Sequence, residues 1–191
     1  MTDKNVSIMN IGSMGYLPQV FKKIENEKKL NIVYLGGSIT MGCNATKTEL
    51  RYVDRSAKWW QTNFPDAEIS YFNAGIGATT SQFGVARVQE HVLDKQPDLV
   101  FVEFSVNDSS SPLFMETYES LVRRLLKAES VKAVVLINNL FYNTGENAQG
   151  IHNAIGLHYD LPIVSVRNYI FPEIQLGNVC LADYTAGMLH P

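Results

Sequence analysis

The stretch "NIVYLGGSITMG", residues 31–42, runs from an apolar segment into two glycines and then Ser38. An apolar, β-branched run that ends in glycines predicts a buried strand that leaves the sheet through a tight turn. Ser38 and Thr40 follow at the place where the next helix is expected to begin. The stretch therefore predicts a strand-to-helix junction with a serine at its start.

Similar apolar runs recur along the chain and alternate with segments of helical periodicity. The further predicted strands are "EISYFNAGIG", "DLVFVEFSVND", "VKAVVLINNLF" and "LPIVSV". The predicted helices span residues 49–64, 80–95, 115–130 and 145–160, and a leading helix at about 17–29 is expected to pack outside this alternation. Alternating strands and helices predict parallel pairing, and hence a three-layer α/β/α sandwich with a five-stranded parallel sheet.

Length, charge and cysteine content limit the function classes. With 191 residues and 46% apolar content, residues 1–191 are expected to form one domain. The net charge of −3 and the lack of a basic block argue against nucleic acid and favour a small, weakly charged or neutral substrate. Cys43 and Cys180 belong to no metal-ligand pattern, so neither a metal nor another cofactor is expected. The sequence shows no signal peptide and no membrane span, which predicts a cytoplasmic protein, or a secreted one if the N-terminus was trimmed, of undetermined oligomeric state.

The turn "GGSITMG" itself permits four interpretations. It can be a structural turn that only starts a helix. A phosphate-binding P-loop is disfavoured because Cys43 and Asn44 stand where that motif needs lysine and a hydroxyl residue. The nucleophile elbow GxSxG is disfavoured because Thr40 replaces the second glycine. The fourth interpretation makes Ser38 a nucleophile at a strand end.

The other strand ends carry groups that suit the fourth interpretation. Ligands in such sheets bind beyond the carboxyl ends of the strands. There, "NAGIGATTS" offers backbone N–H groups at Gly77 and Ala78, and "SVND" offers the Asn107 carboxamide. The chain closes with "LHP", which supplies His190 as a candidate base. A nucleophile, a base and oxyanion donors are therefore expected at one rim of the sheet.

These four blocks, in this order, resemble the SGNH/GDSL hydrolase superfamily. The resemblance covers nearly the whole chain and implies a flavodoxin-like sandwich and ester hydrolysis through an acyl-enzyme. It implies Ser38 as nucleophile, His190 as general base, and an oxyanion hole formed by the Ser38 N–H, a backbone N–H of Gly77 or Ala78, and Asn107. The "GGSIT" form of the first block looks most like a bacterial branch that includes carbohydrate deacetylases. Asp108 is expected to accept hydrogen bonds from neighbouring loops in a structural role.

The chain departs from the superfamily pattern in three places. Ala78 stands where a glycine is usual, which a backbone donor tolerates. Gly187 occupies the usual position of the catalytic aspartate, so either Asp183 folds back toward His190 or a backbone carbonyl orients the imidazole in a Ser-His dyad. The superfamily usually continues into a final helix, so a chain that stops at Pro191 is expected to be clipped or to expose an apolar patch.

The predicted function is a serine esterase for small acyl esters, acetyl above all, on a small molecule or a carbohydrate. Two alternatives stay open: a lipid or thioester hydrolase of the same fold, and a degenerate carbohydrate-binding or interaction module. Trp59 and Trp60 suit either sugar stacking or the core, and helical spacing favours the core. Packed or solvated roles are expected for His91, His152 and His158, which lie in helical segments.

Overall fold

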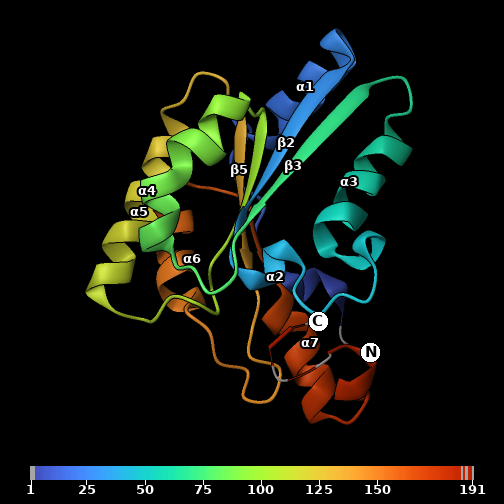
Figure 1. The fold of residues 1–191 in the computed structure, drawn as a ribbon, viewed down its shortest axis with the longest axis vertical. Coiled ribbons are helices and arrows are strands. Elements are labelled where there is room, and N and C mark those ends of the chain that lie inside the picture. The colour runs from blue at the N-terminus through green and yellow to red at the C-terminus, as the bar shows by residue number, and fades with distance from the viewer. Residues whose placement is uncertain (1–2, 186, 188, 191) are drawn as a thin grey trace.

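The computed structural model describes residues 3–185, 187, 189 and 190, and it contains a six-stranded sheet in the order β1-β6-β5-β4-β2-β3 (Figure 1). The strands are β1 (Ile8–Asn10), β2 (Lys29–Gly36), β3 (Glu68–Gly75), β4 (Leu99–Glu103), β5 (Ala133–Asn138) and β6 (Ile163–Ser165). Strands β2 to β6 pair in parallel, whereas β1 pairs with β6 antiparallel. The predicted five parallel strands are confirmed, and β1 extends the sheet.

Helices cover both faces of this sheet. They are α1 (Leu17–Glu27), α2 (Ser38–Met41), α3 (Tyr52–Asn63), α4 (Ser81–His91), α5 (Pro112–Leu126), α6 (Gln149–His158) and α7 (Val166–Gln175). Figure 1 shows α4, α5 and α6 on one face and α1 and α3 on the other. The three-layer α/β/α sandwich is therefore confirmed. No helix in the described part of the chain is long and apolar enough to cross a lipid bilayer.

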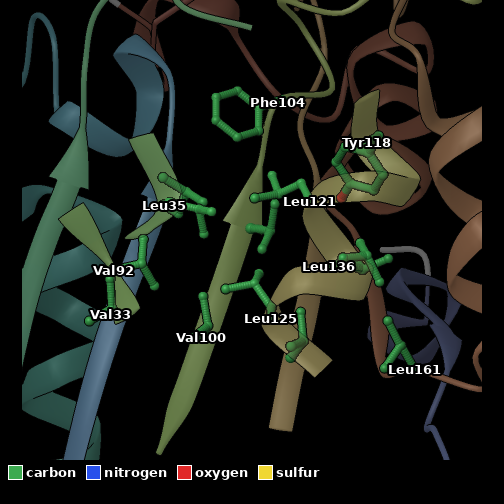
Figure 2. Packing of buried hydrophobic residues seen from close by; sticks show 14 of the residues in the cluster. Val33, Leu35, Val92, Val100, Phe104, Tyr118, Leu121, Leu125, Leu136 and Leu161 are labelled. Carbon is green, nitrogen blue, oxygen red and sulfur yellow. The ribbon is translucent and has the colours of Figure 1, made fainter. Parts of the chain in front are cut away.

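The larger core lies between the sheet and helices α4 to α6 (Figure 2). Leu35 of β2, Val100 of β4 and Leu136 of β5 meet Leu121 and Leu125 of α5, and all five side chains are fully buried. Because helices also cover the opposite face, these central strands are buried on both sides. Their continuous apolar runs are the reason that sequence pattern identified them.

A second core lies on the face that carries α1 and α3. Val20 and Ile24 of α1 and Trp60 of α3 are buried against the side chains of β2 and β5. Helix α1 thus covers the sheet together with α3, which differs from the expectation that the leading helix would pack outside the alternation. Toward the carboxyl ends of the strands this face has an apolar hollow of about 480 Å³, lined in part by Ile39 and Phe101.

Two elements escaped sequence analysis. Strand β1 has only three residues, of which two are exposed, so it carries no period-two burial signal. Helix α7 contains Pro172, a residue that normally ends a helix. It begins directly after β6, where the Ser165 side chain accepts a hydrogen bond from the Asn168 N–H at 3.1 Å. Because β6 and α7 follow each other without a loop, the sequence pattern does not show where the strand ends and the helix begins.

Candidate active site

Gly36 and Gly37 occur together because α2 folds directly back over the ends of the strands. A Cβ atom at Gly36 would collide with the Thr40 hydroxyl and with the backbone oxygen of Glu103. A Cβ atom at Gly37 would collide with the Oδ1 atom of Asn107. The two glycines therefore allow the loop after β4 and the start of α2 to meet at the place where Ser38 lies.

Ser38 and His190 form the central contact of the site. Ser38 is the first residue of α2, and only 7% of its surface is exposed. The Nε2 atom of His190 lies 2.9 Å from the Ser38 Oγ atom, although 152 positions separate the two residues. At this distance an unprotonated Nε2 accepts the serine proton. The predicted pairing of these two side chains is thus present in the structure, whereas Pro191 lies outside the described residues.

Three potential oxyanion donors surround this pair. The Ser38 N–H lies in the first turn of α2, where backbone N–H groups have no intrahelical acceptor. A Cβ atom built on Gly77 would lie 4.0 Å from the Ser38 Cβ atom, so Gly77 adjoins the serine. The Asn107 Oδ1 atom is buried against Gly37 without a hydrogen-bond partner among the described residues, and no hydrogen bond from its amide nitrogen to them is found. The amide nitrogen is therefore available to a ligand.

Gly77 and Ala78 differ in backbone conformation. Ala78 has φ of +57°, a left-handed conformation that costs a non-glycine residue roughly 1–2 kcal/mol. The glycine usual at this position in the superfamily would adopt it without that cost. Gly77 adjoins Ser38 and is therefore a candidate for the backbone donor, as Ala78 remains.

Asn73 and Arg87 fix the loops that carry these donors. The Asn73 side chain donates to the Thr40 backbone oxygen at 2.8 Å and accepts from the Gly75 N–H at 2.9 Å, which joins β3 to α2. The Arg87 guanidinium donates to the backbone oxygens of Ala74 at 2.6 Å and Gly36 at 3.1 Å. Arg87 is only 6% exposed, and burial lowers its pKa to about 10. This buried cation holds the ends of β2 and β3 together.

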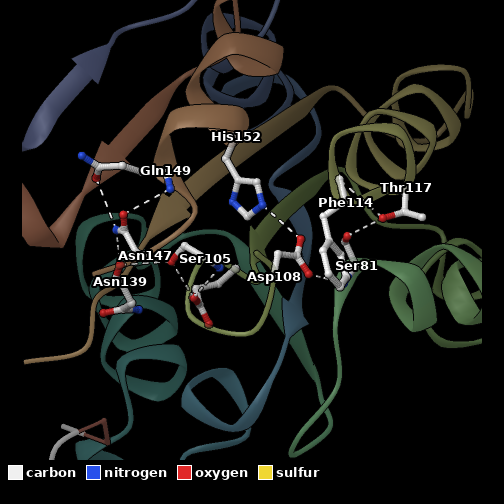
Figure 3. Close-up of polar contacts among 10 residues, drawn as sticks. Ser81, Ser105, Asp108, Phe114, Thr117, Asn139, Asn147, Gln149 and His152 are labelled. Carbon is white, nitrogen blue, oxygen red and sulfur yellow. Dashed lines mark hydrogen bonds and ion pairs between the residues drawn. The ribbon is translucent and has the colours of Figure 1, made fainter. Parts of the chain in front are cut away.

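Asp108 and His152 form a buried pair beside the site (Figure 3). The Asp108 carboxylate accepts from the Ser81 N–H at 2.9 Å and from His152 Nε2 at 3.0 Å. His152 is fully buried and stacks on Tyr118 with ring centroids 3.7 Å apart, and burial lowers its pKa. Asp108 thus accepts hydrogen bonds from helices α4 and α6 rather than from the neighbouring loops that were expected, and His152 is packed in the core.

Glu103 is a buried carboxyl group at the end of β4. Its Oε1 atom accepts from the Ser105 N–H at 3.2 Å and from the Ser105 hydroxyl at 3.1 Å. Its Oε2 atom is buried without a hydrogen-bond partner among the described residues. Burial raises the pKa of Glu103 to about 7. The folded protein thus favours the protonated form of this side chain at mildly acidic pH.

Glu103→Gln is expected to change how stability depends on pH. Since the folded-state pKa of Glu103 exceeds its ordinary value of 4.5, the unsubstituted protein has its full stability below that value and loses stability as pH rises toward about 7. The loss amounts to at most about 3 kcal/mol. Urea unfolding between about pH 5 and pH 8 should show this slope in the unsubstituted protein and a reduced slope in Glu103→Gln. Parallel slopes would contradict the assignment, and exposed Glu129→Gln is the control.

Asp183 is not brought to His190. It ends the 3₁₀ helix η4 (Leu181–Asp183), its side chain is exposed, and no hydrogen bond joins it to His190 among the described residues. Instead, the amide nitrogen of Asn44 lies 3.5 Å from His190 Nδ1. Asp183 and Asn44 line the same hollow of about 320 Å³. Among the described residues, no carboxylate hydrogen-bonds to His190, so the structure shows a Ser-His pair without the aspartate of a triad.

Asp183→Asn is therefore expected to change kcat on a small ester by less than about threefold, whereas a catalytic aspartate would cost on the order of 10,000-fold. The measurement is steady-state hydrolysis of p-nitrophenyl acetate. Asn44→Ala is measured beside it, because the Asn44 amide lies 3.5 Å from the Nδ1 atom of the His190 imidazole. A loss of kcat of a hundredfold or more in Asp183→Asn would show instead that Asp183 acts in a Ser-His-Asp triad.

Sequence analysis did not identify Asn44 or Arg87. Asn44 lies in the loop after α2, and its φ of +65° is a conformation that asparagine tolerates better than most residues, so it reads as an ordinary turn residue. Arg87 lies on a helix, where an arginine normally faces solvent. Within the described residues, no group of three or more histidine, cysteine, aspartate or glutamate side chains is placed to hold a metal ion.

The chain is similar in structure to known esterases. No curated protein sequence matches the chain. Among solved structures, a two-domain esterase active on acetylated mannans, crystallized with mannopentaose, is 46% identical with a TM-score of 0.97. That match covers 100% of this chain and 52% of the esterase, so the chain spans about half of that protein. A catalytic mutant of Axe2, an acetylxylan esterase from Geobacillus stearothermophilus, is 20% identical over 85% of this chain and 86% of its own, with a TM-score of 0.69. The second likeness concerns the fold alone.

The family model named GDSL-like Lipase/Acylhydrolase matches residues 34–186, which is more than half of the chain. The matched segment includes Ser38, Gly77, Ala78 and Asn107. The superfamily resemblance found in the sequence is confirmed by this match. The chain belongs to the GDSL-like lipase/acylhydrolase family.

Proposed function

We propose that the domain is a serine esterase that removes small acyl groups, chiefly acetyl, from carbohydrate. The observation that carries this proposal is the 2.9 Å contact between the Ser38 Oγ and His190 Nε2 atoms at the carboxyl ends of the strands. A buried serine in contact with a histidine, next to unoccupied N–H donors, is the arrangement that acyl transfer needs.

In the first half of the reaction, His190 Nε2 takes the Ser38 proton while Oγ bonds to the carbonyl carbon of the ester. The negative charge that forms on the carbonyl oxygen is stabilised by the N–H groups of Ser38 and Gly77 and by the Asn107 amide. The bond to the sugar oxygen then breaks, and His190 gives its proton to that oxygen. The products are a free sugar hydroxyl and an acetyl group bonded to Ser38.

In the second half, a water molecule attacks the acyl-enzyme. His190 takes a proton from the water as its oxygen bonds to the acyl carbon, and the same donors stabilise the second tetrahedral intermediate. The bond to Ser38 breaks, Oγ regains its proton from His190, and acetate leaves. One ester and one water thus give one alcohol and one acid, without a cofactor.

The carbohydrate part of the proposal is supported by similarity. The two-domain esterase that is 46% identical to this chain, over 100% of this chain, is active on acetylated mannans. The blocks that carry the reaction are retained here at Ser38, Asn107 and His190. A neutral sugar also suits a chain with a net charge of only −3.

The proposal is tested by hydrolysis of p-nitrophenyl acetate, butyrate and octanoate beside acetylated manno- and xylo-oligosaccharides. A steep fall in kcat/KM beyond acetate, with release of acetate from the sugars, is the expected result. Turnover of p-nitrophenyl esters without release of acetate from any sugar would overturn the carbohydrate assignment. Absence of turnover on all of them would favour the degenerate binding module.

A lipid hydrolase is the second candidate, because of the apolar hollow of about 480 Å³ that Ile39, the neighbour of Ser38, helps to line. Each methylene group buried in such a hollow would contribute about 0.8 kcal/mol. If that hollow accepts the acyl chain, kcat/KM rises from acetate to octanoate, and Ile39→Trp abolishes the rise. The same series of esters therefore distinguishes the two candidates.

A further inference from the structure

A groove of about 690 Å³ lies between α3 and the edge strand β3, away from the Ser38–His190 pair. Its lining includes Trp59, Gln61 and Asn63 of α3 and Tyr71 of β3. Aromatic side chains beside a few polar groups are typical of the lining of ligand sites. The reaction proposed above uses none of these side chains.

The two adjacent tryptophans have different roles. Trp60 is 5% exposed and belongs to the second core, whereas Trp59 is 51% exposed. The indole of Trp59 rests edge-on against Trp60, with ring centroids 5.1 Å apart and an angle of 88° between the planes. Because its neighbours fix it, the exposed indole loses little conformational freedom when a ligand stacks on it.

The polar groups of the groove suit an uncharged, hydroxyl-rich ligand. The charged side chains that line it are the cations Arg55 and Lys58 and the carboxylates Glu49 and Asp54, of which Asp54 is paired with Arg51, so the lining has no large excess of either charge. Carboxamides and carboxylates donate to or accept from hydroxyl groups, and an aromatic ring binds the apolar face of a sugar. A phosphorylated or strongly acidic ligand would require an excess of positive charge.

The groove is connected to the candidate active site through Arg51. The Arg51 guanidinium donates to Asp54 at 2.6 Å and to the Met41 backbone oxygen at 3.4 Å. Asp54 lines the groove and also accepts from the Tyr71 hydroxyl at 2.8 Å. Met41 ends the short helix that starts at Ser38. A single polar network therefore runs from the groove to the helix of the candidate nucleophile.

We infer that the groove between α3 and β3 is a saccharide-binding subsite for neutral sugar units, with Trp59 as its stacking platform. The inference rests on the proposed function only in regarding these units as part of a polymeric substrate. Binding of an unsubstituted oligosaccharide is therefore the direct test, since it needs no ester bond.

The experiment compares Trp59→Ala with Phe72→Ala. Phe72 is 42% exposed in the same strand as Tyr71, but adjacent strand residues point to opposite faces, so it is the matched control. We expect mannopentaose or xylopentaose to bind the unsubstituted protein in calorimetry, and Trp59→Ala to weaken binding about threefold to tenfold. Trp59→Phe should retain part of the affinity. Phe72→Ala should bind like the unsubstituted protein.

Kinetics separate the subsite from the ester-cleaving centre. Trp59→Ala should leave hydrolysis of p-nitrophenyl acetate within about twofold and raise KM for acetylated pentasaccharides about threefold to tenfold at constant kcat. Equal losses on both substrates, unchanged pentasaccharide binding in Trp59→Ala, or no binding by the unsubstituted protein would each overturn the inference. Concentration-dependent self-association that Trp59→Ala removes, without sugar binding, would identify a protein interface instead.

Discussion

Ser38→Ala is expected to lower kcat for p-nitrophenyl acetate by at least about 10,000-fold, because removal of a serine nucleophile abolishes the covalent path. Only the residual effect of the oxyanion donors and of substrate binding remains in such a variant. The side chain is small and 7% exposed at the start of α2, so its loss should leave the fold intact. Steady-state rates and the melting temperature of the same preparation provide the measurement.

The control for this substitution is Ser109→Ala. Ser109 is exposed in the loop after β4, close to Asn107 in sequence, and it makes no side-chain hydrogen bond with the described residues. Its replacement should leave kcat unchanged. His190→Ala should lose activity to a similar extent as Ser38→Ala, and the double variant should lose little more, because the two side chains act as one unit. Activity within tenfold of normal in Ser38→Ala would remove Ser38 from the site.

Asn107→Ala is expected to lower kcat about 100- to 1,000-fold with KM nearly unchanged. An oxyanion donor interacts most strongly in the transition state, so its loss appears in kcat. The Asn107 Oδ1 atom lies buried against Gly37 without a hydrogen-bond partner among the described residues, and the amide nitrogen is the group of this side chain that can donate to an oxyanion. Rates on p-nitrophenyl acetate check this, together with the melting temperature.

Asn107→Asp sharpens the test. A carboxylate in this position would face the developing oxyanion, so repulsion should add to the lost hydrogen bond and activity should fall below that of Asn107→Ala. If Asn107 were only a turn residue, aspartate would substitute well and both variants would stay near normal. Asn26→Ala, on the exposed surface of α1, is the control for removal of a carboxamide. Near-normal kcat at an unchanged melting temperature would exclude Asn107 from the site.

The part of the fold that sequence predicts is the part with strong periodicity. Strands β2, β4 and β5 are buried on both faces, so their apolar runs are continuous and unambiguous. Strand β1 depends on pairing with β6, which is a tertiary contact that no local pattern encodes. Helix α7 is hidden by Pro172 and by the absence of a loop between it and β6. Short elements such as β1, and elements that contain residues unfavourable for them such as α7, are identified only in the three-dimensional structure.

For the candidate site, sequence locates the groups that end a strand and misses those that act from elsewhere. Ser38 and Asn107 follow parallel strands, and such strand ends meet at one rim of the sheet. His190 was identified from the closing "LHP" and from the superfamily resemblance, and the structure brings it to Ser38. Asn44 and Arg87 act through a loop contact and a buried helix face, and only three-dimensional packing reveals either. The orientation of the His190 imidazole is likewise a property of loop packing.

Covalent labelling tests the central claim, that Ser38 is a nucleophile activated by His190. A fluorophosphonate reacts only with an activated serine, and peptide mass spectrometry of the labelled protein identifies which one. We predict a single adduct on the peptide that contains Ser38, no adduct in Ser38→Ala, and much slower labelling in His190→Ala, in which the base 2.9 Å away is missing. An adduct on any other serine, or labelling of Ser38→Ala at the normal rate, would contradict the account.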